Sequence, residues 1–258
     1  MKLKYWARAA LLPVLLPLAY RDGKRVLAAV PRLPDAREPA GTVPGPGPAV
    51  RVLLIGESTM AGVGVATHDR GFAGHLARTL GAGWSREVQW WVEGHSGFTL
   101  KRLLAEVIPD LPPRPADLIV LGMGANEAFK MNTPAGFRCD MRATLTALRQ
   151  RFGAGVPILI LNMPPIREFP AFTPVLRFTL GNMIECFGAE LERLIPEFPR
   201  TFFDARLLRR AEWEERLGVR GAEHWFSDGV HPSELTYRHW AQDFGAFILD
   251  HFPRATDL

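Results

Sequence analysis

The chain has 258 residues, of which 47% are apolar and 22% are charged, and its formal net charge is +4 at pH 7. This length and composition are typical of one folded domain with additional segments, and they exclude a disordered chain. The positive charge is mostly arginine and is diffuse, without a basic tail or zinc-finger spacing, so the sequence does not indicate nucleic-acid binding. Two cysteines, Cys139 and Cys186, are too few for a disulfide scaffold.

The first 30 residues combine apolar and basic side chains. An apolar stretch from Ala9 to Tyr20 stands between basic residues on both sides. It is shorter than the roughly 20 residues that span a bilayer, and Pro13 and Pro17 disfavour a regular helix. We favour a segment, residues 1–25, that lies on a membrane surface and makes the protein membrane-associated. The alternatives are an export signal, which would make the protein exported or periplasmic, and a segment packed into the fold.

A proline-rich stretch separates this segment from a folded domain. Residues 31–49 hold six prolines, which predicts a stiff, extended linker. The domain itself is predicted over residues 50–252, where strand and helix patterns alternate. Continuous apolar runs predict buried strands at residues 50–55, 88–92, 117–124, 156–163 and 200–205. Alternating strands and helices imply a parallel sheet with right-handed crossovers.

Capping residues predict where several helices begin and end. Thr99 is expected to cap a helix that stops before Pro109. The pair Thr133–Pro134 opens a helix that Gly153 closes, and Ser233 caps the last helix. These assignments leave the segments between strand ends and helix starts as loops at one edge of the sheet.

Four short motifs fall at that edge, where parallel sheets bind their ligands. Ser58 lies in "GESTMAGVG" after the first strand, and Gly97 lies in "EGHSGFTL" after the second. Asn126 lies in "GMGANE" after the third strand, while Asp228 and His231 lie in "SDGVHPSE" before the last helix. Taken singly, each motif also fits an ordinary turn or helix cap. Their occurrence together predicts one catalytic site.

The residue types of these motifs suit acyl transfer. Ser58 becomes a nucleophile when a base takes its proton, and His231 is the predicted base. Asp228, three residues earlier, is placed to orient the imidazole and stabilise its protonated form. The backbone N–H groups of Ser58 and Gly97 and the side-chain amide of Asn126 are the candidate oxyanion donors. A glycine at position 97 lets the main chain approach the substrate closely.

This set of motifs resembles the SGNH, or GDSL-type, hydrolase superfamily over residues 51–250. That family carries serine, glycine, asparagine and histidine in four blocks in this order, which "GESTMAG", "GHSGFT", "GANE" and "DGVHP" resemble. Glu57 and Glu127 stand where the family usually has aspartate. The resemblance implies a serine esterase that needs no metal or organic cofactor. It favours a flavodoxin-like three-layer α/β/α sandwich with five parallel strands.

The expected reaction is hydrolysis of a carboxylic ester, with a lipid acyl, aryl or sugar O-acyl substrate. An O-acyltransferase that uses the same residues and a catalytically silent lipid- or glycan-binding module are the alternatives. A metal site on Asp228, His231 and His224 is disfavoured, because no third ligand has suitable spacing. Phe169 and Phe172 flank Pro170 after the fourth strand, at the same edge of the sheet. We expect them to line an apolar substrate pocket beside Ser58.

Overall fold

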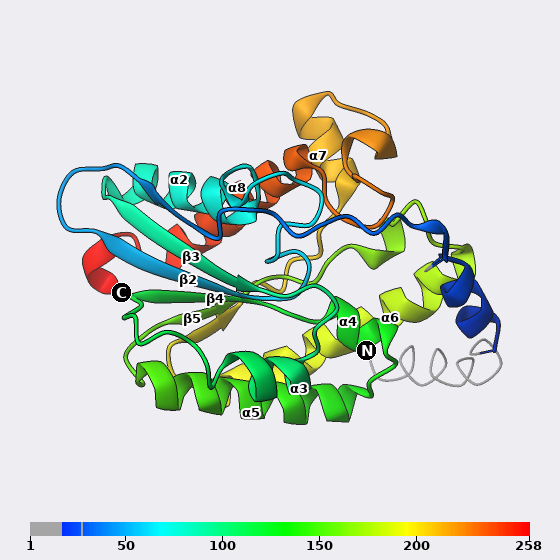
Figure 1. Cartoon of the computed structure of the whole chain (residues 1–258), viewed down its shortest axis with the longest axis horizontal. Coiled ribbons are helices and arrows are strands. Elements are labelled where there is room, and N and C mark those ends of the chain that lie inside the picture. The colour runs from blue at the N-terminus through cyan, green and yellow to red at the C-terminus, as the bar shows by residue number, and fades with distance from the viewer. Residues whose placement is uncertain (1–16, 27) are drawn as a thin grey trace.

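The computed structural model describes residues 17–26 and 28–258. Its centre is a sheet of six strands in the order β1-β3-β2-β4-β5-β6 (Figure 1). All neighbouring strands are parallel except β1, which runs antiparallel to β3. The strands are β1 (Ala40–Val43), β2 (Val50–Gly56), β3 (Val88–Gly94), β4 (Leu118–Gly122), β5 (Ile158–Ile160) and β6 (Thr201–Phe203).

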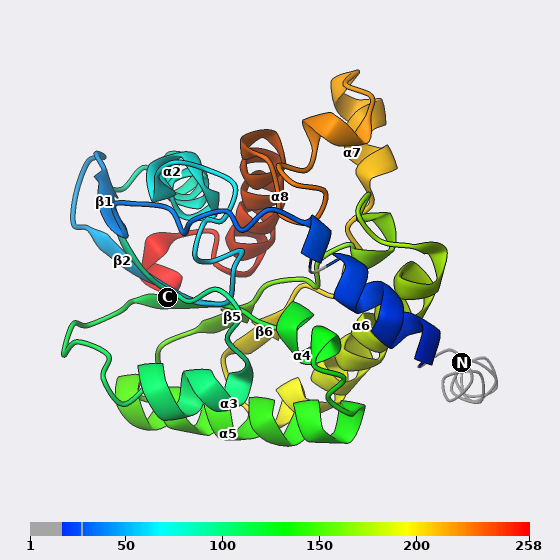
Figure 2. The same cartoon turned by 45° about the vertical axis from the view of Figure 1, so that its right-hand side comes forward.

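Helices cover both faces of this sheet. In Figures 1 and 2, α2 and α8 lie on one face, and α3, α5 and α6 lie on the other. The helices are α2 (Phe72–Trp84), α3 (Leu100–Arg102, continued by a π-helical turn over Leu103–Val107), α4 (Ala125–Phe129), α5 (Pro134–Phe152), α6 (Pro174–Leu194), α7 (Arg210–Leu217) and α8 (Glu234–His251). The five parallel strands have the flavodoxin-like order. The three-layer α/β/α prediction is therefore confirmed, with one further strand.

The sequence signals for strands and helix ends have clear counterparts. The strands β2, β4 and β5 are almost wholly buried, as expected of apolar runs covered on both faces. The side chains of Thr133 and Ser233 accept backbone N–H bonds at the starts of α5 and α8, and Gly153 follows α5. The prediction for Thr99 is wrong in one respect. It precedes α3, but its side chain makes no capping hydrogen bond, and the first N–H of the helix, from Leu100, donates to the Glu127 carboxylate.

The additional strand comes from the segment that the sequence predicts to be a linker. Residues 40–43 are extended, as expected, but they pair with β3 as the edge strand β1. The residues before β1 also contact the domain, since the Ala36 N–H donates to the Ala61 carbonyl at 2.9 Å. Extended chain next to an unpaired strand edge gains ladder hydrogen bonds, which the proline content alone does not reveal.

The N-terminal segment is described from residue 17 onward, and its earlier part lies outside the described residues. Residues 17–26 are helical, and Pro17 is the first residue described. Ala19 and Asp22 are buried, and the Thr173 hydroxyl donates to the Asp22 carboxylate at 2.8 Å. This helix therefore packs beside the start of α6. Of the residues described, no helix is long and apolar enough to cross a membrane.

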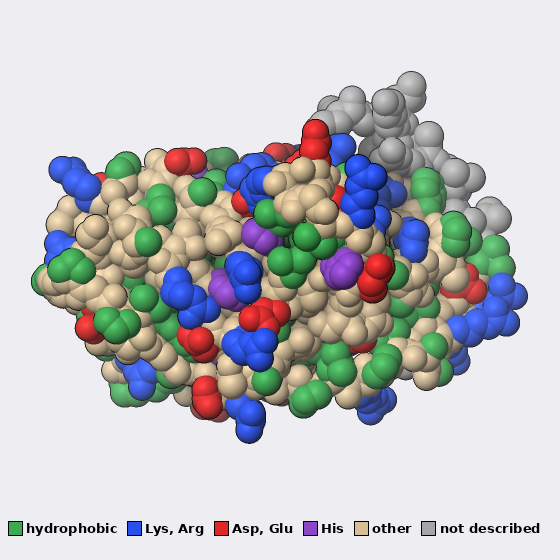
Figure 3. All heavy atoms as spheres, turned by 90° about the horizontal axis from the view of Figure 1, so that it is seen from above, with side chains coloured by type: hydrophobic (Ala, Val, Ile, Leu, Met, Phe, Trp, Pro, Cys, Tyr) green, Lys and Arg blue, Asp and Glu red, His purple; other side chains and the backbone are tan. Residues whose placement is uncertain are grey.

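The face formed by α2 and α8 carries charges of both signs. Figure 3 views this face and shows basic, acidic and histidine side chains interspersed on it. Arg78 pairs with Asp69 at 2.7 Å, and Arg70 pairs with Glu234. Opposite charges next to one another leave little net field on this face.

Candidate active site

A row of three glycines marks the carboxyl edge of the sheet. Gly56 at the end of β2 pairs with Gly94 of β3 on one side and with Gly122 of β4 on the other. A Cβ at Gly56 would lie 2.1 Å from the Gly122 carbonyl oxygen, and a Cβ at Gly94 would lie 2.4 Å from the Ala61 nitrogen. Only glycine therefore lets the turn after β2 fold down onto its neighbours. The loops that carry Ser58, Gly97 and Asn126 all begin from this row.

Ser58 lies two residues beyond the row, half-buried, in a tight turn. Its carbonyl accepts the Val63 N–H at 3.1 Å, and the Val63 carbonyl accepts the hydroxyl of Tyr237 at 2.8 Å. Tyr237 lies on α8 and is fully buried, which raises the pKa of its hydroxyl. Helix α8, which follows His231, therefore supports the turn that carries Ser58 through this hydrogen bond.

Asp228 and His231 lie together in residues 226–232, which we call the acid–base loop. Its ends are joined because the Ser227 N–H donates to the His231 carbonyl at 2.9 Å. The loop packs on the turn that follows Ser58, since a Cβ at Gly64 would lie 2.4 Å from the Pro232 carbonyl oxygen. The predicted nucleophile and base therefore belong to two segments in direct contact.

The Asp228 carboxylate accepts three hydrogen bonds within its own loop. One oxygen lies 2.7 Å from His231 Nδ1, and the other accepts the backbone N–H groups of Val230 and His231 at 2.9 and 2.7 Å. Burial works to raise the pKa of Asp228, but the bonds from the His231 ring and the backbone outweigh it. The pKa of Asp228 consequently lies below its usual range, and Asp228 stays an acceptor for the ring N–H.

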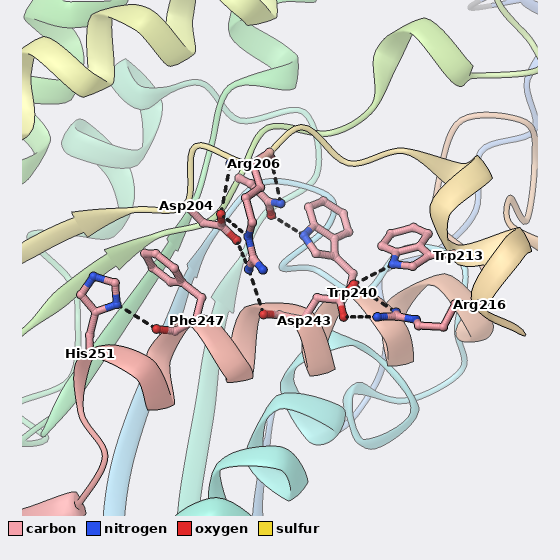
Figure 4. A network of polar contacts seen from close by, with 9 residues as sticks. Asp204, Arg206, Trp213, Arg216, Trp240, Asp243, Phe247 and His251 are labelled. Atoms are coloured by element: carbon pink, nitrogen blue, oxygen red, sulfur yellow. Dashed lines mark hydrogen bonds and ion pairs between the residues drawn. The ribbon is translucent and has the colours of Figure 1, made fainter.

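The segment that precedes the acid–base loop is fastened to α8 and to the end of β5 (Figure 4). The Trp213 indole on α7 and the Arg216 guanidinium both donate to the carboxylate of Asp243, at 2.7 and 2.9 Å. Just beyond β5, the side chain of Asn162 donates from Nδ2 to the Arg206 carbonyl at 3.3 Å, and its Oδ1 accepts the Trp240 indole N–H of α8 at 2.6 Å. Trp213 also stacks on Trp225, next to the loop, with ring centroids 5.7 Å apart. These contacts give the loop a rigid support.

The other two candidate oxyanion donors lie on neighbouring loops. Gly97 is exposed, has a φ of +77°, and has open space around the position of a would-be Cβ. Asn126 lies on α4, where its side-chain Nδ2 donates to the Phe98 carbonyl at 3.1 Å. An amide NH₂ has two N–H groups, so one is left for a substrate. Gly97 is therefore open to solvent, and Asn126 is half-buried.

Two buried carboxylates connect these loops. Glu57 accepts the backbone N–H groups of Ala125 and Asn126 at 2.7 and 2.8 Å, and Glu127 accepts the Leu100 N–H at 2.6 Å. Burial and, to a smaller extent, the charge of Glu127 raise the pKa of Glu57 to about 7, against the effect of the backbone bonds. Both carboxylate oxygens of Glu57 are thus bonded to the start of α4. We call residues 56–58, 95–100 and 124–127 the donor ring.

Phe169 and Phe172 lie beside the acid–base loop. The intervening Ala171 N–H donates to the Gly229 carbonyl at 3.1 Å, and the Phe169 ring contacts Phe226 at 5.5 Å between centroids. Phe172 contacts Phe129 at the end of α4, at 5.9 Å. Phe169 and Phe172 are 4% and 8% exposed, whereas Phe129 is 39% exposed. The exposed part of this aromatic cluster is therefore Phe129, which the sequence analysis does not single out.

Several supporting residues escape sequence reasoning for different reasons. Asn162 lies two residues beyond the end of β5, so the strand-end rule that selects Asn126 also reaches it. Tyr237 reads as an ordinary apolar position of α8 and has no sequence signal. Glu57 and Glu127 do carry a signal, because they depart from the usual aspartates of the family that the motifs resemble. Within residues 17–26 and 28–258, no group of three His, Cys, Asp or Glu residues is arranged to hold a metal ion.

At the carboxyl edge of this flavodoxin-like sheet the structure thus has a serine in a tight turn and, in the segment packed on that turn, a hydrogen-bonded aspartate–histidine pair. The chain matches the model of the GDSL-like lipase/acylhydrolase family over residues 54–239. It belongs to this family and is a GDSL-type esterase. No curated protein matches it by sequence comparison.

Solved structures of similar proteins agree with this fold. A G-D-S-L family lipolytic protein from Veillonella parvula is 16% identical, with a TM-score of 0.56 over 78% of this chain and 97% of that one. TesA is 20% identical, with a TM-score of 0.57 over 77% and 97%. A variant of Axe2, an acetylxylan esterase from Geobacillus stearothermophilus, is 16% identical, with a TM-score of 0.55 over 78% and 93%. At these identities the likeness is one of fold.

Proposed function

We propose that the protein hydrolyses carboxylic esters, of a lipid acyl, aryl or sugar O-acyl kind, through an acyl-enzyme on Ser58. His231 is the general base and Asp228 orients its ring. The observation that carries this proposal is the 2.7 Å bond between Asp228 and His231 Nδ1, in a loop packed on the turn after Ser58. The bond leaves Nε2 as the ring nitrogen for the serine proton.

The proposed reaction has two halves. His231 takes the proton of the Ser58 hydroxyl as the oxygen attacks the ester carbonyl, and the alcohol leaves with that proton. Water, deprotonated by His231, then attacks the acyl-enzyme, and the proton returns to Ser58 as the acid leaves. In both tetrahedral intermediates the negative oxygen accepts from the N–H groups of Ser58 and Gly97 and from the Asn126 amide.

A serine-directed phosphonate tests this assignment. We expect one adduct, on the peptide that contains Ser58, and loss of activity in proportion to labelling. A chain-length series of p-nitrophenyl esters, measured before and after labelling, then defines the acyl group that the site accepts. Labelling of a different residue, or turnover that survives full modification of Ser58, would contradict the proposal.

The acyl group is proposed to lie against the aromatic cluster of Phe129, Phe169 and Phe172. Phe172→Ala should weaken long-chain esters selectively, by about 0.8 kcal/mol, or about fourfold in kcat/KM, per methylene no longer buried. Phe252→Ala is the matched control, since Phe252 is 4% exposed but packs on Phe202 near the opposite edge of the sheet. Equal losses on acetate and octanoate esters would argue against a pocket at Phe172.

We propose further that residues 1–25 hold the enzyme at an anionic membrane surface. The helix over residues 17–26 lies on the same side of the domain as α4 (Figures 1 and 2). Its outer side carries Tyr20, which is 67% exposed and lies under the Lys24 ammonium at 4.6 Å, and the exposed cation Arg25. Exposed aromatic and basic side chains together suit the headgroup region.

Vesicle binding of the full chain tests this location. Lys24→Glu/Arg25→Glu should weaken pelleting with anionic vesicles and leave turnover of small soluble esters intact. Lys101→Glu/Arg114→Glu, which changes the same charge at exposed positions elsewhere, is the control. An equal loss in both variants would mean a general charge effect. A mature N-terminus between residues 20 and 31 in cell-derived protein would instead support the exported alternative.

A further inference from the structure

We propose that Glu57 and Glu127 are positioning residues that set the geometry of the three oxyanion donors. The inference rests on the function proposed above, because it takes Ser58, Gly97 and Asn126 as the donors. The donors lie on three separate loops, and each pair of loops is joined by hydrogen bonds. The two glutamates supply the bonds that no backbone ladder provides.

Glu57 ties the first loop to the third. It precedes Ser58 in the chain, and its own N–H donates to the Gly122 carbonyl at 3.0 Å. Its two carboxylate oxygens accept the first N–H groups of α4, from Ala125 and Asn126. The backbone beside the nucleophile and the backbone that carries the Asn126 amide therefore move as one unit.

Glu127 ties the third loop to the second. One oxygen accepts the Leu100 N–H at 2.6 Å, where the loop of Gly97 enters α3, and the other accepts the Asn132 amide at 2.8 Å. The Asn126 amide adds a bond to the Phe98 carbonyl at 3.1 Å. The first and second loops are joined by the His95 N–H, which donates to the Gly56 carbonyl at 3.0 Å.

A carboxylate is the side chain that this arrangement requires. Glu57 and Glu127 are 4% and 2% exposed, and burying a carboxylate is costly unless its acceptor oxygens are satisfied. Each one binds two donors with two separate oxygens. Glutamine has the same size but only one acceptor oxygen, so its NH₂ group would face an N–H. At a pH above about 7, where the carboxyl of Glu57 is ionised, the substitution therefore disturbs the donor ring without removing volume, and the variants are compared at such a pH.

The expected kinetic signature is a loss of kcat with little change in KM. The donors bond most strongly to the negative oxygen of the transition state, so a displaced donor raises that barrier and hardly affects substrate binding. Glu57→Gln and Glu127→Gln should each lower kcat about 10- to 100-fold, while KM stays within about threefold. Glu168→Gln is the matched control, because Glu168 is a half-buried carboxylate that accepts the Arg210 N–H at the start of α7. It should keep normal kcat.

A double-mutant cycle with Asn126→Ala provides the decisive measurement. If Glu57 acts through the Asn126 amide, Glu57→Gln should cost much less in the Asn126→Ala background than in the wild type. The same full loss in both backgrounds, or a rise in KM at constant kcat, would overturn the positioning role. Should Glu57→Gln fail to fold, Glu57→Asp enters the same cycle, since it keeps the charge and moves the oxygens by one methylene. Phosphonate labelling of Ser58 in each variant distinguishes failure of this inference from failure of the nucleophile assignment.

Discussion

The acid–base loop and the donor ring lie at the same edge of the sheet but are built in different ways. The bonds of Asp228 reach no further than His231, three residues away. The bonds of Glu57 reach across 68 and 69 residues to α4. The pKa of Asp228 is lowered, because bonds from a histidine ring and the backbone outweigh its burial, whereas burial raises the pKa of Glu57 to about 7. A buried carboxylate thus stays ionised easily beside a partner that can take positive charge, and less easily among neutral N–H groups near a second carboxylate.

In the proposed mechanism both regions act on Ser58, so the largest effect is expected there. Ser58→Ala and His231→Ala should each reduce kcat by at least about 10⁴-fold, because either change removes the activated nucleophile. The double variant should be scarcely worse than either single one, since the two residues act as a unit. Steady-state kinetics on a soluble ester measure this. Near-normal turnover in Ser58→Ala would rule out the mechanism.

Asp228→Asn breaks the acid–base loop alone. An asparagine keeps the shape but cannot accept from the ring in the same way, so the imidazole takes the wrong tautomer. We expect kcat to fall about 10³- to 10⁴-fold while phosphonate labelling of Ser58 becomes correspondingly slow. A small effect would mean that another group orients His231.

Asn126→Ala breaks the donor ring alone. It removes the amide that we propose donates to the developing oxyanion, so kcat should fall about 10²- to 10³-fold with a smaller change in KM. The comparison with Asp228→Asn is made on the same ester and at the same pH. If instead KM rises and kcat is preserved, Asn126 binds the substrate in its ground state.

Glu57 and Asp228 should also give the free energy of unfolding opposite dependences on pH. The folded pKa of Glu57 is raised to about 7, so its stabilising contribution is complete below about pH 4.5 and is lost as the pH rises through 7. The free energy of unfolding of the wild type relative to Glu57→Gln should therefore fall by about 3 kcal/mol between pH 4.5 and 8. For Asp228, whose pKa is lowered, the contribution is present above its usual pKa and is lost in acid. Urea titrations of the wild type, Glu57→Gln and Asp228→Asn over this pH range check both predictions. A free energy of unfolding that changes with pH in the same way in all three proteins would contradict them.

The sequence alone predicts the parts of this protein that depend on local pattern. Apolar runs identified the five parallel strands, because strands covered on both faces must be apolar along their length. The three-residue spacing of Asp228 and His231 predicted a contact that one turn of backbone can make. Thr133 and Ser233 predicted helix starts through bonds to the chain just ahead of them.

Only the tertiary structure decided the parts that depend on segments far apart in the chain. Residues 40–43 read as linker and became strand β1, because the edge of β3 offers ladder hydrogen bonds that composition does not record. The Thr99 side chain caps no N–H of α3, and the first N–H of that helix, from Leu100, donates to Glu127 on α4, 27 residues later in the chain. The hydrogen-bond partners of Glu57 and Glu127 could not be assigned from the sequence. Those partners are N–H groups of residues far apart in the chain, which only folding brings next to the two carboxylates. Local spacing thus determined the acid–base loop, and long-range packing determined the donor ring.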